Sequence, residues 1–369
     1  MRKYILLYFI CVLLAFPSPV TSKDLLRRGL FVTVLQDPQV LSSREEITKL
    51  IDFAKQARVR TLFVQIYRAN KAWFASKVGD SAPYEAALQN VSENPFALLI
   101  KEAHASGIQV HAWLNLLSLS GNQNAPLLKK YGPDILTRNL KKKKTIEDYK
   151  IDNQYFLEPG DLRVREELSN LVEEVLRAYP ALDGVQFDYI RYPDKNPFYG
   201  YTQMNVERFK KATGRKTVNE SDKLWKDWRR DQVTDLLELL VKKTRALRPD
   251  IQISTTGCMS YLRAYHEAFQ DWPSWLKRHL VDFVTVMSYS RDTSQFEKYL
   301  LDAKSKTEDF GKVNVAIGAY AMESSPETFA TQFRLCEQAG GGACVILHYG
   351  NLLQNPALTN PLLSSRKSP

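Results

Sequence analysis

The sequence contains few of the residues from which metal centres and disulfide frameworks are built, with 4 cysteines and 5 histidines among 369 residues. No cysteine pair has metal-ligand spacing, and neither a His-x-His pair nor a His-Glu-x-x-His motif is present. We therefore predict no metal site and expect no cofactor. Three cysteines follow the amino-terminal leader, Cys258, Cys336 and Cys344. Because their number is odd, no disulfide framework is predicted, and the pairing of Cys336 with Cys344 is left open.

Other catalytic signatures are also absent. There is no Gly-x-Ser-x-Gly elbow for a nucleophilic serine, and no glycine-rich phosphate turn follows an early strand-like run. After residue 22, no apolar run approaches the length of a membrane span. Carboxylates are therefore the best candidates for acid–base chemistry.

Residues 1–22 have the pattern of a secretory signal peptide. Two basic residues precede an apolar run from Tyr4 to Phe16, and the small residues Val20-Thr21-Ser22 suit a cleavage site. The apolar run is short for a membrane span, although an uncleaved amino-terminal anchor is the alternative. We expect a mature chain that begins near Lys23 and is exported, either periplasmic or secreted.

The chain is basic, with a formal charge of +10, and loss of Arg2 and Lys3 with the leader lowers this charge by two. Four further cations form one run, Lys141 to Lys144. A basic exported protein suits an anionic polymer or an envelope surface, and export disfavours nucleic acid as a partner. A solvated loop is the alternative interpretation of the lysine run. We expect a monomeric protein that has a glycan as its partner and associates with the envelope.

From Gly29 onward, short apolar runs alternate with amphipathic segments, which is typical of parallel βα units. Eight runs are predicted as strands: 30–35, 61–67, 108–114, 184–188, 251–255, 283–289, 313–317 and 343–348. Eight strands that each precede a helix predict an α/β protein, a (β/α)8 TIM barrel, with one glycoside-hydrolase-like domain over residues 23–369. An open doubly wound sheet is the alternative.

Helix start signals lie between these strands. Ser43 followed by Glu46 forms a capping box, and Asn94-Pro95 supplies an N-cap and a proline at the first helical position. Two connections, 116–159 and 193–222, are longer than usual and follow strands three and four. We expect them to build a substrate groove on the carboxyl-terminal face of the barrel, with loose surface decoration as the alternative.

The fourth predicted strand runs directly into charged and aromatic residues. A strand buried on both faces should be continuously apolar, yet Gln186 and Asp188 share one face by period-two alternation. Asp188 ends the strand, where catalytic residues of TIM barrels lie. We therefore predict Asp188 as the general acid or acid/base. A satisfied ion pair with Arg191 is the structural alternative.

The other strand ends supply aromatic and hydrogen-bonding side chains. Sugars need both, because their C–H faces stack on aromatic rings while their hydroxyls require directional partners. The predicted substrate-binding residues are Tyr67, Arg68, His111, Trp113, Asn115, Glu158, Gln186, Tyr189, Arg191, Tyr192, Tyr289, Tyr320, His348 and Tyr349.

A two-carboxylate mechanism needs a partner for Asp188. Asp37, Glu158 and Glu323 are the candidates, and a substrate N-acetyl group could replace all three. The alternative for each is a surface carboxylate or a helix cap.

The segment Asp183-Gly184-Val185-Gln186-Phe187-Asp188-Tyr189-Ile190-Arg191-Tyr192-Pro193 resembles the central motif of the glycoside-hydrolase-10-like barrel proteins of bacterial envelopes. His111-Ala112-Trp113-Leu114-Asn115 is similar to the third strand of that family, and Leu157-Glu158-Pro159-Gly160 to a segment usually written Leu-Asp-Pro-Gly. The resemblance spans most of the mature chain. It implies a barrel hydrolase that acts on amino-sugar polymers, such as peptidoglycan glycan strands or partly deacetylated poly-N-acetylglucosamine.

A more distant resemblance is to family-18 chitinases, whose fourth strand reads Asp-Gly-x-Asp-x-Asp-x-Glu and whose sixth carries Met-x-Tyr-Asp. The matching residues are Asp183, Gly184, Asp188, Met287 and Tyr289. Ile190 and Ser290 stand where the chitinase acid and the aspartate that positions the N-acetyl group would be. A chitinase mechanism therefore does not carry over intact.

Together with these resemblances, the sequence predicts a secreted glycoside hydrolase that cleaves an amino-sugar-containing envelope glycan or exopolysaccharide by carboxylate acid/base catalysis. The alternative from another class is a non-catalytic, glycan-binding envelope protein on the same barrel, because a fold does not fix a function.

Overall fold

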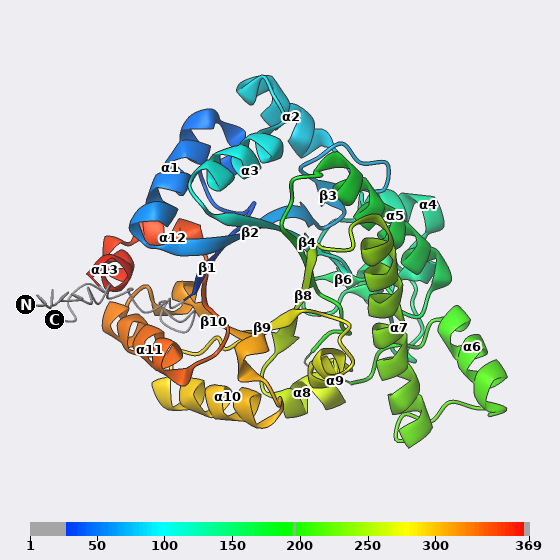
Figure 1. The fold of residues 1–369 in the computed structure, drawn as a ribbon. Helices are drawn as coiled ribbons and strands as arrows, with labels where there is room; N and C mark the ends of the chain where they lie inside the picture. Colours follow the sequence, from blue (N-terminus) through cyan, green and yellow to red (C-terminus); the bar gives the residue numbers. More distant parts are fainter. Residues whose placement is uncertain (1–26, 195–196, 365–369) are drawn as a thin grey trace, which may run out of the picture.

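The computed structural model describes residues 27–194 and 197–364, and in it eight parallel strands close into a barrel inside a ring of helices (Figure 1). The barrel strands are β1 (Arg28–Val32), β2 (Val59–Arg68), β4 (Gln109–Asn115), β7 (Gly184–Asp188), β8 (Gln252–Cys258), β9 (Phe283–Met287), β10 (Val313–Gly318) and β11 (Cys344–Leu347). They neighbour one another in chain order, and β1 pairs with both β2 and β11. This closure confirms the (β/α)8 barrel and excludes the open sheet.

Helices on the outside of the barrel connect the strands. Their bounds are α1 (Arg44–Gln56), α2 (Ala82–Val91), α3 (Pro95–Ala105), α5 (Leu162–Ala178), α7 (Lys223–Leu247), α8 (Tyr261–His266), α9 (Trp272–Lys277), α10 (Thr293–Ser305), α11 (Pro326–Ala339), α12 (Tyr349–Gln354) and α13 (Pro356–Ser364). The predicted starts are confirmed, because Ser43 accepts a hydrogen bond from the Glu46 amide and Asn94 accepts one from the Ala97 amide.

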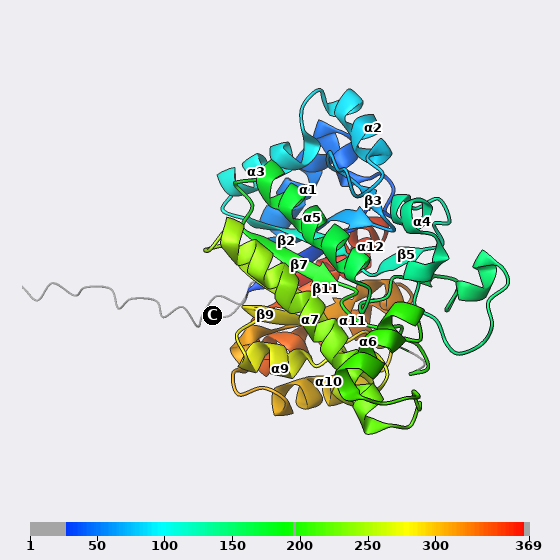
Figure 2. The ribbon, with the colours of Figure 1, turned by 90° about the vertical axis from the view of Figure 1, so that its right-hand side faces the viewer.

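The two long connections form substructures of their own at one end of the barrel. The first contains β5 (Ser118–Ser120), α4 (Pro126–Tyr131) and β6 (Tyr155–Phe156), and β5 pairs with β6 in antiparallel fashion. The second contains α6 (Gln203–Thr213). Figure 2 shows β5 and α4 projecting beyond one end of the barrel, and their place in the chain, after the carboxyl end of β4, makes this the carboxyl-terminal face. A short strand, β3 (Lys71–Ala72), adds to β2 on the same side.

Two separate apolar clusters fill the barrel wall and its lumen. The larger lies between the sheet and the helices, and it includes the predicted helical stripe Val164, Leu168, Leu171, Val172 and Val175 of α5. The smaller occupies the lumen, where Phe31 packs against Phe63 and Trp113 with ring centroids 5.2 and 4.8 Å apart. The lumen is therefore a packed core, and ligands have access only at its two mouths.

The structure answers the question of cysteine pairing that the sequence left open. Cys336 of α11 forms a disulfide with Cys344 at the start of β11, and their Cα atoms lie 6.0 Å apart. The odd count arises because Cys258 is the free, buried member. The predicted signal peptide, residues 1–22, lies outside the described residues. Within the described part of the chain, no helix is both long enough and apolar enough to cross a bilayer.

Candidate functional site at the carboxyl-terminal mouth of the barrel

Asp188 lies at the end of β7 and is only 4% exposed. Its Oδ2 accepts a hydrogen bond of 2.9 Å from Trp113 Nε1. Its Oδ1 accepts from the Thr256 hydroxyl and, at 2.7 Å, from the Tyr189 amide. Arg191 Nη1 lies 3.5 Å from the same oxygen. These groups donate hydrogens or carry positive charge, which suits a carboxylate that acts as an acceptor and an anion.

Arg191 lies between two carboxylates. Burial acts to lower the pKa of Arg191, yet that pKa is raised overall because Cys258, Asp194 and Asp188 lie nearby. Asp194 Oδ2 lies 3.9 Å from the Cys258 sulfur and 3.4 Å from Arg263 Nη2. Asp194 is therefore a second carboxylate whose charge acts on Arg191, the neighbour of Asp188. The sequence prediction did not include it, because it follows Pro193, the last residue of the motif.

Tyrosines border Asp188 on two sides. Arg191 stacks over the Tyr189 ring at 4.3 Å, and Tyr189 has a positive φ of 56° that sets the turn after β7. Tyr289 and Tyr320 contact edge to face at 5.8 Å, and Tyr320 is 46% exposed. Burial and the nearby Asp188 raise the pKa of Tyr289, which keeps this phenol neutral. The structure thus gathers Asp188 and five predicted substrate-binding residues at one mouth: Trp113, Tyr189, Arg191, Tyr289 and Tyr320.

A buried polar chain supports the same mouth from the other side. Asn115 Oδ1 accepts from Gln65 Nε2 at 2.9 Å, and Gln65 Oε1 accepts from the Thr33 hydroxyl at 2.8 Å. Gln65 and Thr256 were not predicted. A period-two reading would have placed Gln65 with Phe63 on the lumen face of its strand.

Two predicted residues lie deeper in the lumen. Gln186 is fully buried and lies two residues before Asp188 on the same face of β7. His111 is also fully buried, packs against Phe63 at 5.2 Å and lines the cavity at the amino-terminal mouth. Burial lowers the pKa of His111 to about 4. Because both side chains are covered and His111 faces the opposite mouth, the structure does not place them in a substrate groove.

Two predicted tyrosines face the helices. Tyr67 and Tyr349 are fully buried in the outer core. A register irregularity between Gln65 and Tyr67 pairs Tyr67 with Leu114, which also belongs to the outer core. The structure therefore places Tyr67 away from the mouth at which it was predicted to bind substrate, because a β-bulge ends strict alternation.

Glu158 and Tyr192 form a buried pair beneath the two long loops. The Tyr192 hydroxyl donates to Glu158, and Thr137, Gly160 and Asn205 donate to the same carboxylate. Glu158 is fully buried, and burial raises its pKa. This enclosure makes Glu158 a loop-anchoring residue, so it is not an accessible partner for Asp188.

The remaining candidates lie after strands β1, β10 and β11. Asp37 is exposed, and the Glu323 side chain accepts a hydrogen bond of 2.7 Å from Asn351. His348 caps α12 by accepting from the Gly350 amide at 3.1 Å. Burial lowers the pKa of His348, and Glu323 opposes this shift. No contact within the described ranges joins these three residues to Asp188.

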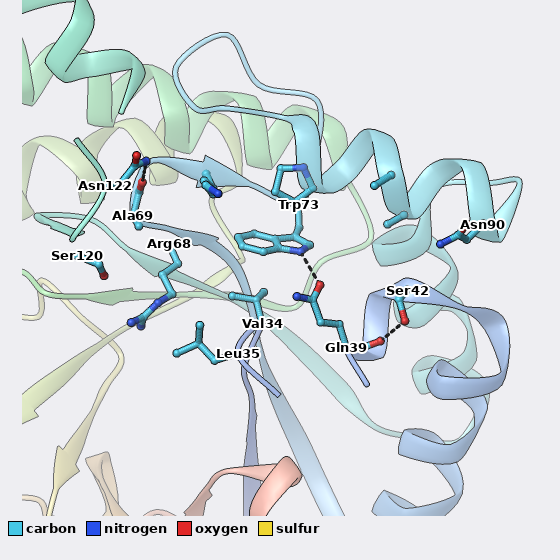
Figure 3. Close-up of a pocket in the computed structure, with 14 residues that line it drawn as sticks. Val34, Leu35, Gln39, Ser42, Arg68, Ala69, Trp73, Asn90, Ser120 and Asn122 are labelled. Atoms are coloured by element: carbon cyan, nitrogen blue, oxygen red, sulfur yellow. Dashed lines mark hydrogen bonds between the residues drawn. The ribbon is translucent and has the colours of Figure 1, made fainter. Parts of the chain in front are cut away.

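Arg68 borders a cleft of about 660 Å³ beside the ends of β1 and β2 (Figure 3). Trp73 and Leu35 contribute its apolar surface. The cleft was not predicted as a unit, because its residues come from four separate segments.

The family profile described as glycosyl hydrolase-like 10 matches residues 27–331. The glycosyl hydrolase YngK of Bacillus subtilis (strain 168) is 25% identical over 268 residues, which cover 68% of this chain and 50% of that protein. The glycosyl hydrolase DigH of Escherichia coli (strain K12) is 21% identical over 271 residues, which cover 67% and 59%. The matched region thus spans half the length of YngK and 59% of the length of DigH.

Solved glycosidases share the barrel at low identity. The catalytic domain of a β-amylase from Paenibacillus polymyxa has a TM-score of 0.59 and 11% identity, with 93% of this chain and 99% of that chain covered. The β-galactosidase Gan42B of G. stearothermophilus has a TM-score of 0.55 and 13% identity, with 91% and 56% covered. These likenesses show the fold, whereas the family supports a glycosidase-like function. The chitinase resemblance stays a prediction. Because the family profile matches most of its residues, this chain belongs to the glycosyl hydrolase-like 10 family.

Proposed function

We propose that this protein is an exported glycoside hydrolase that cleaves an amino-sugar-containing glycan with Asp188 as its central carboxylate. One observation carries the proposal. Asp188 ends β7 at the carboxyl-terminal mouth of the barrel, where the catalytic residues of TIM barrels lie, and donors from three segments bind its two oxygens. A carboxylate held in one orientation is what stabilisation of a charged transition state requires.

The proposed role of Asp188 is that of an anion. Glycoside cleavage passes through an oxocarbenium-like state, and a fixed carboxylate next to the sugar stabilises the developing positive charge. Trp113 and Thr256 fix the orientation of the carboxylate, while Arg191 balances its charge. The phenols of Tyr289 and Tyr320 and the Tyr189 ring offer stacking faces and hydroxyl partners for the sugar.

The proposed second carboxylate is Asp194. It shares the neighbour Arg191 with Asp188, whereas Glu158 is enclosed and the Glu323 side chain contacts Asn351. Asp194 is half-buried, which leaves it accessible to a leaving-group oxygen or a water. Within this proposal, Asp194 transfers the proton and Asp188 remains ionised.

The substrate class is tested with four polymers side by side. Peptide-free peptidoglycan strands, partly deacetylated poly-N-acetylglucosamine, cellulose and xylan are incubated with purified protein, and new reducing ends are counted. We expect release from an amino-sugar polymer. Preferential cleavage of cellulose or xylan would contradict the proposal. Binding of an amino-sugar polymer without any release would instead identify a glycan-binding protein.

Export is part of the proposal and rests on residues 1–22. The disulfide between Cys336 and Cys344 supports it, because such bonds persist in oxidising compartments. We expect N-terminal sequencing of the protein from an expressing culture to begin near Lys23. Recovery of membrane-bound protein that retains Met1 would show an uncleaved anchor.

A further inference from the structure

We propose that the cleft beside the ends of β1 and β2 is a subsite for a carboxylate-bearing sugar of the glycan, and that Arg68 recognises the carboxylate. This inference rests on the proposed function and adds to it the charge of the substrate and the residue that reads this charge.

The charge of the cleft is one-sided. Arg68 and Lys71 line it, and no aspartate or glutamate does. No hydrogen bond or ion pair engages either of these two side chains among the residues that the structure describes, although most other arginines of the chain do have such partners. Two cations without compensation in one cleft favour an anionic ligand.

The remaining surface suits a pyranose. Leu35 and Pro83 supply apolar contact area beside the largely buried Trp73 ring, and Leu35 is 66% exposed. The Trp73 ring is fixed because its Nε1 donates to Gln39 at 3.4 Å. In Figure 3, Arg68 lies on one side of Trp73, and Gln39 lies on the other. Asn90, Ser42, Ser120 and Asn122 add polar groups for hydroxyls.

Arg68 connects the cleft with the candidate catalytic centre. It ends β2, and its charge acts on the Tyr189 phenol, where it opposes the burial that raises the pKa of that group. Tyr189 in turn follows Asp188 directly. Because Arg68 ends β2 at the same mouth of the barrel at which Asp188 ends β7, we place the cleft along the glycan on the β2 side of Asp188.

A guanidinium matches a carboxylate with two parallel hydrogen bonds, so Arg68 distinguishes a carboxylate from a neutral hydroxymethyl group. The same charge disfavours a polymer that carries protonated amines, because like charges repel across the cleft. Of the two amino-sugar polymers in the substrate test, the inference selects peptidoglycan strands over deacetylated poly-N-acetylglucosamine.

The test measures binding by titration calorimetry to the full chain carrying Asp188→Asn, in which turnover is expected to be strongly slowed. The two probes are peptide-free peptidoglycan fragments with free carboxylates, and the same fragments after reduction of the carboxyl groups to alcohols. We expect the charged fragments to bind about tenfold more tightly, and this preference to weaken as salt is added. Equal affinity for the two probes overturns the inference.

Variants then assign the preference to Arg68. In the same background, Arg68→Gln should reduce the ratio to about twofold or less, and Arg68→Lys should retain part of it. Arg60→Gln is the matched control, because Arg60 belongs to the same strand but lines the opposite mouth. An unchanged ratio in Arg68→Gln overturns the assignment. Lys71→Gln, at an exposed position, should also lower the ratio of affinities for the charged and the reduced fragments. This measurement tests the charge of the cleft even if the Arg68 variant does not fold.

Failure of this inference is distinguishable from failure of the proposed function. Equal binding of both probes, together with reducing-end release by the unsubstituted protein, rejects the charged subsite and leaves the hydrolase standing. Absence of binding to both probes rejects the subsite as well, and absence of release from every polymer then rejects the hydrolase.

Discussion

Asp188→Asn should lower kcat by ~10²–10³ while leaving glycan affinity nearly unchanged, because the amide keeps the shape of the side chain but loses the charge that stabilises the transition state. The carboxylate of Asp188 has donors on both oxygens and Arg191 at 3.5 Å. A neutral amide in that position cannot stabilise positive charge on the sugar. The measurement is the rate of reducing-end release at saturating substrate, with affinity measured separately.

The structure also predicts a small cost in stability for this variant. Whichever way the amide turns, its NH2 group faces either Trp113 Nε1 or the pair formed by the Thr256 hydroxyl and the Tyr189 amide. The Thr256 hydroxyl can rotate and accept a hydrogen bond, whereas Trp113 Nε1 and the Tyr189 amide can only donate. We expect a loss of about 1 kcal/mol from one broken hydrogen bond. Turnover within a few-fold of the unsubstituted enzyme would refute the catalytic role.

Asp183→Asn is the matched control for this experiment. Asp183 precedes the same strand, and its Oδ2 accepts from the Val110 amide and contacts His104 Nε2, each at 2.8 Å. We expect this variant to lose stability without a comparable loss of kcat, since it lies at the opposite end of β7. If Asp188→Asn unfolds while Asp183→Asn does not, Asp188 is the structural ion pair.

The same assay tests whether Asp194 is the second catalytic carboxylate. Asp194→Asn should reduce kcat and shift the acidic or basic limb of the rate profile, because it removes a titrating group beside Asp188. Glu323→Gln and Asp37→Asn should have smaller effects, since neither side chain contacts the Asp188 centre. A larger loss of kcat in Glu323→Gln or Asp37→Asn than in Asp194→Asn would assign the second catalytic carboxylate to that residue instead.

Glu158→Ala should destabilise the protein by about 3–5 kcal/mol, because it leaves several buried donors without an acceptor. Tyr192, Thr137 and Asn205 donate to this carboxylate from three different segments. A loss of this size is a large fraction of the ~5–15 kcal/mol that stabilises a typical domain. Denaturant unfolding measures it. Glu166→Ala, at an exposed position of the adjacent helix α5, should change stability by less than about 0.5 kcal/mol.

The pH dependence of the Glu158→Gln variant provides a second test. Burial raises the pKa of Glu158 above its ordinary value of 4.5, so the folded protein holds this proton more tightly than the unfolded chain. The resulting stability is fully present below pH 4.5 and is lost as pH rises through the raised pKa. Relative to Glu158→Gln, the unsubstituted protein should therefore become less stable as pH rises above 4.5. Parallel stability curves for the two proteins would contradict this account.

The periodicity of the sequence determined the barrel. Each of the eight strands was visible as an apolar run, and Ser43 and Asn94 marked helix starts, because these signals act over a few neighbouring residues. Asp188 was equally visible, since a charged residue at the end of a buried strand breaks the apolar pattern. Local signals of this kind need no knowledge of distant contacts.

Only the tertiary structure decided which strand-end residues share a surface. Tyr67 turned outward because a bulge in β2 changed the pairing register, and His111 faced the other mouth because it sits two residues earlier than Trp113 on the same strand face. Glu158 was enclosed by two loops that meet only after folding. Asp194, Gln65, Thr256 and the cleft beside Arg68 join segments far apart in the chain, and the distances between such segments are set by barrel closure, which no local pattern encodes.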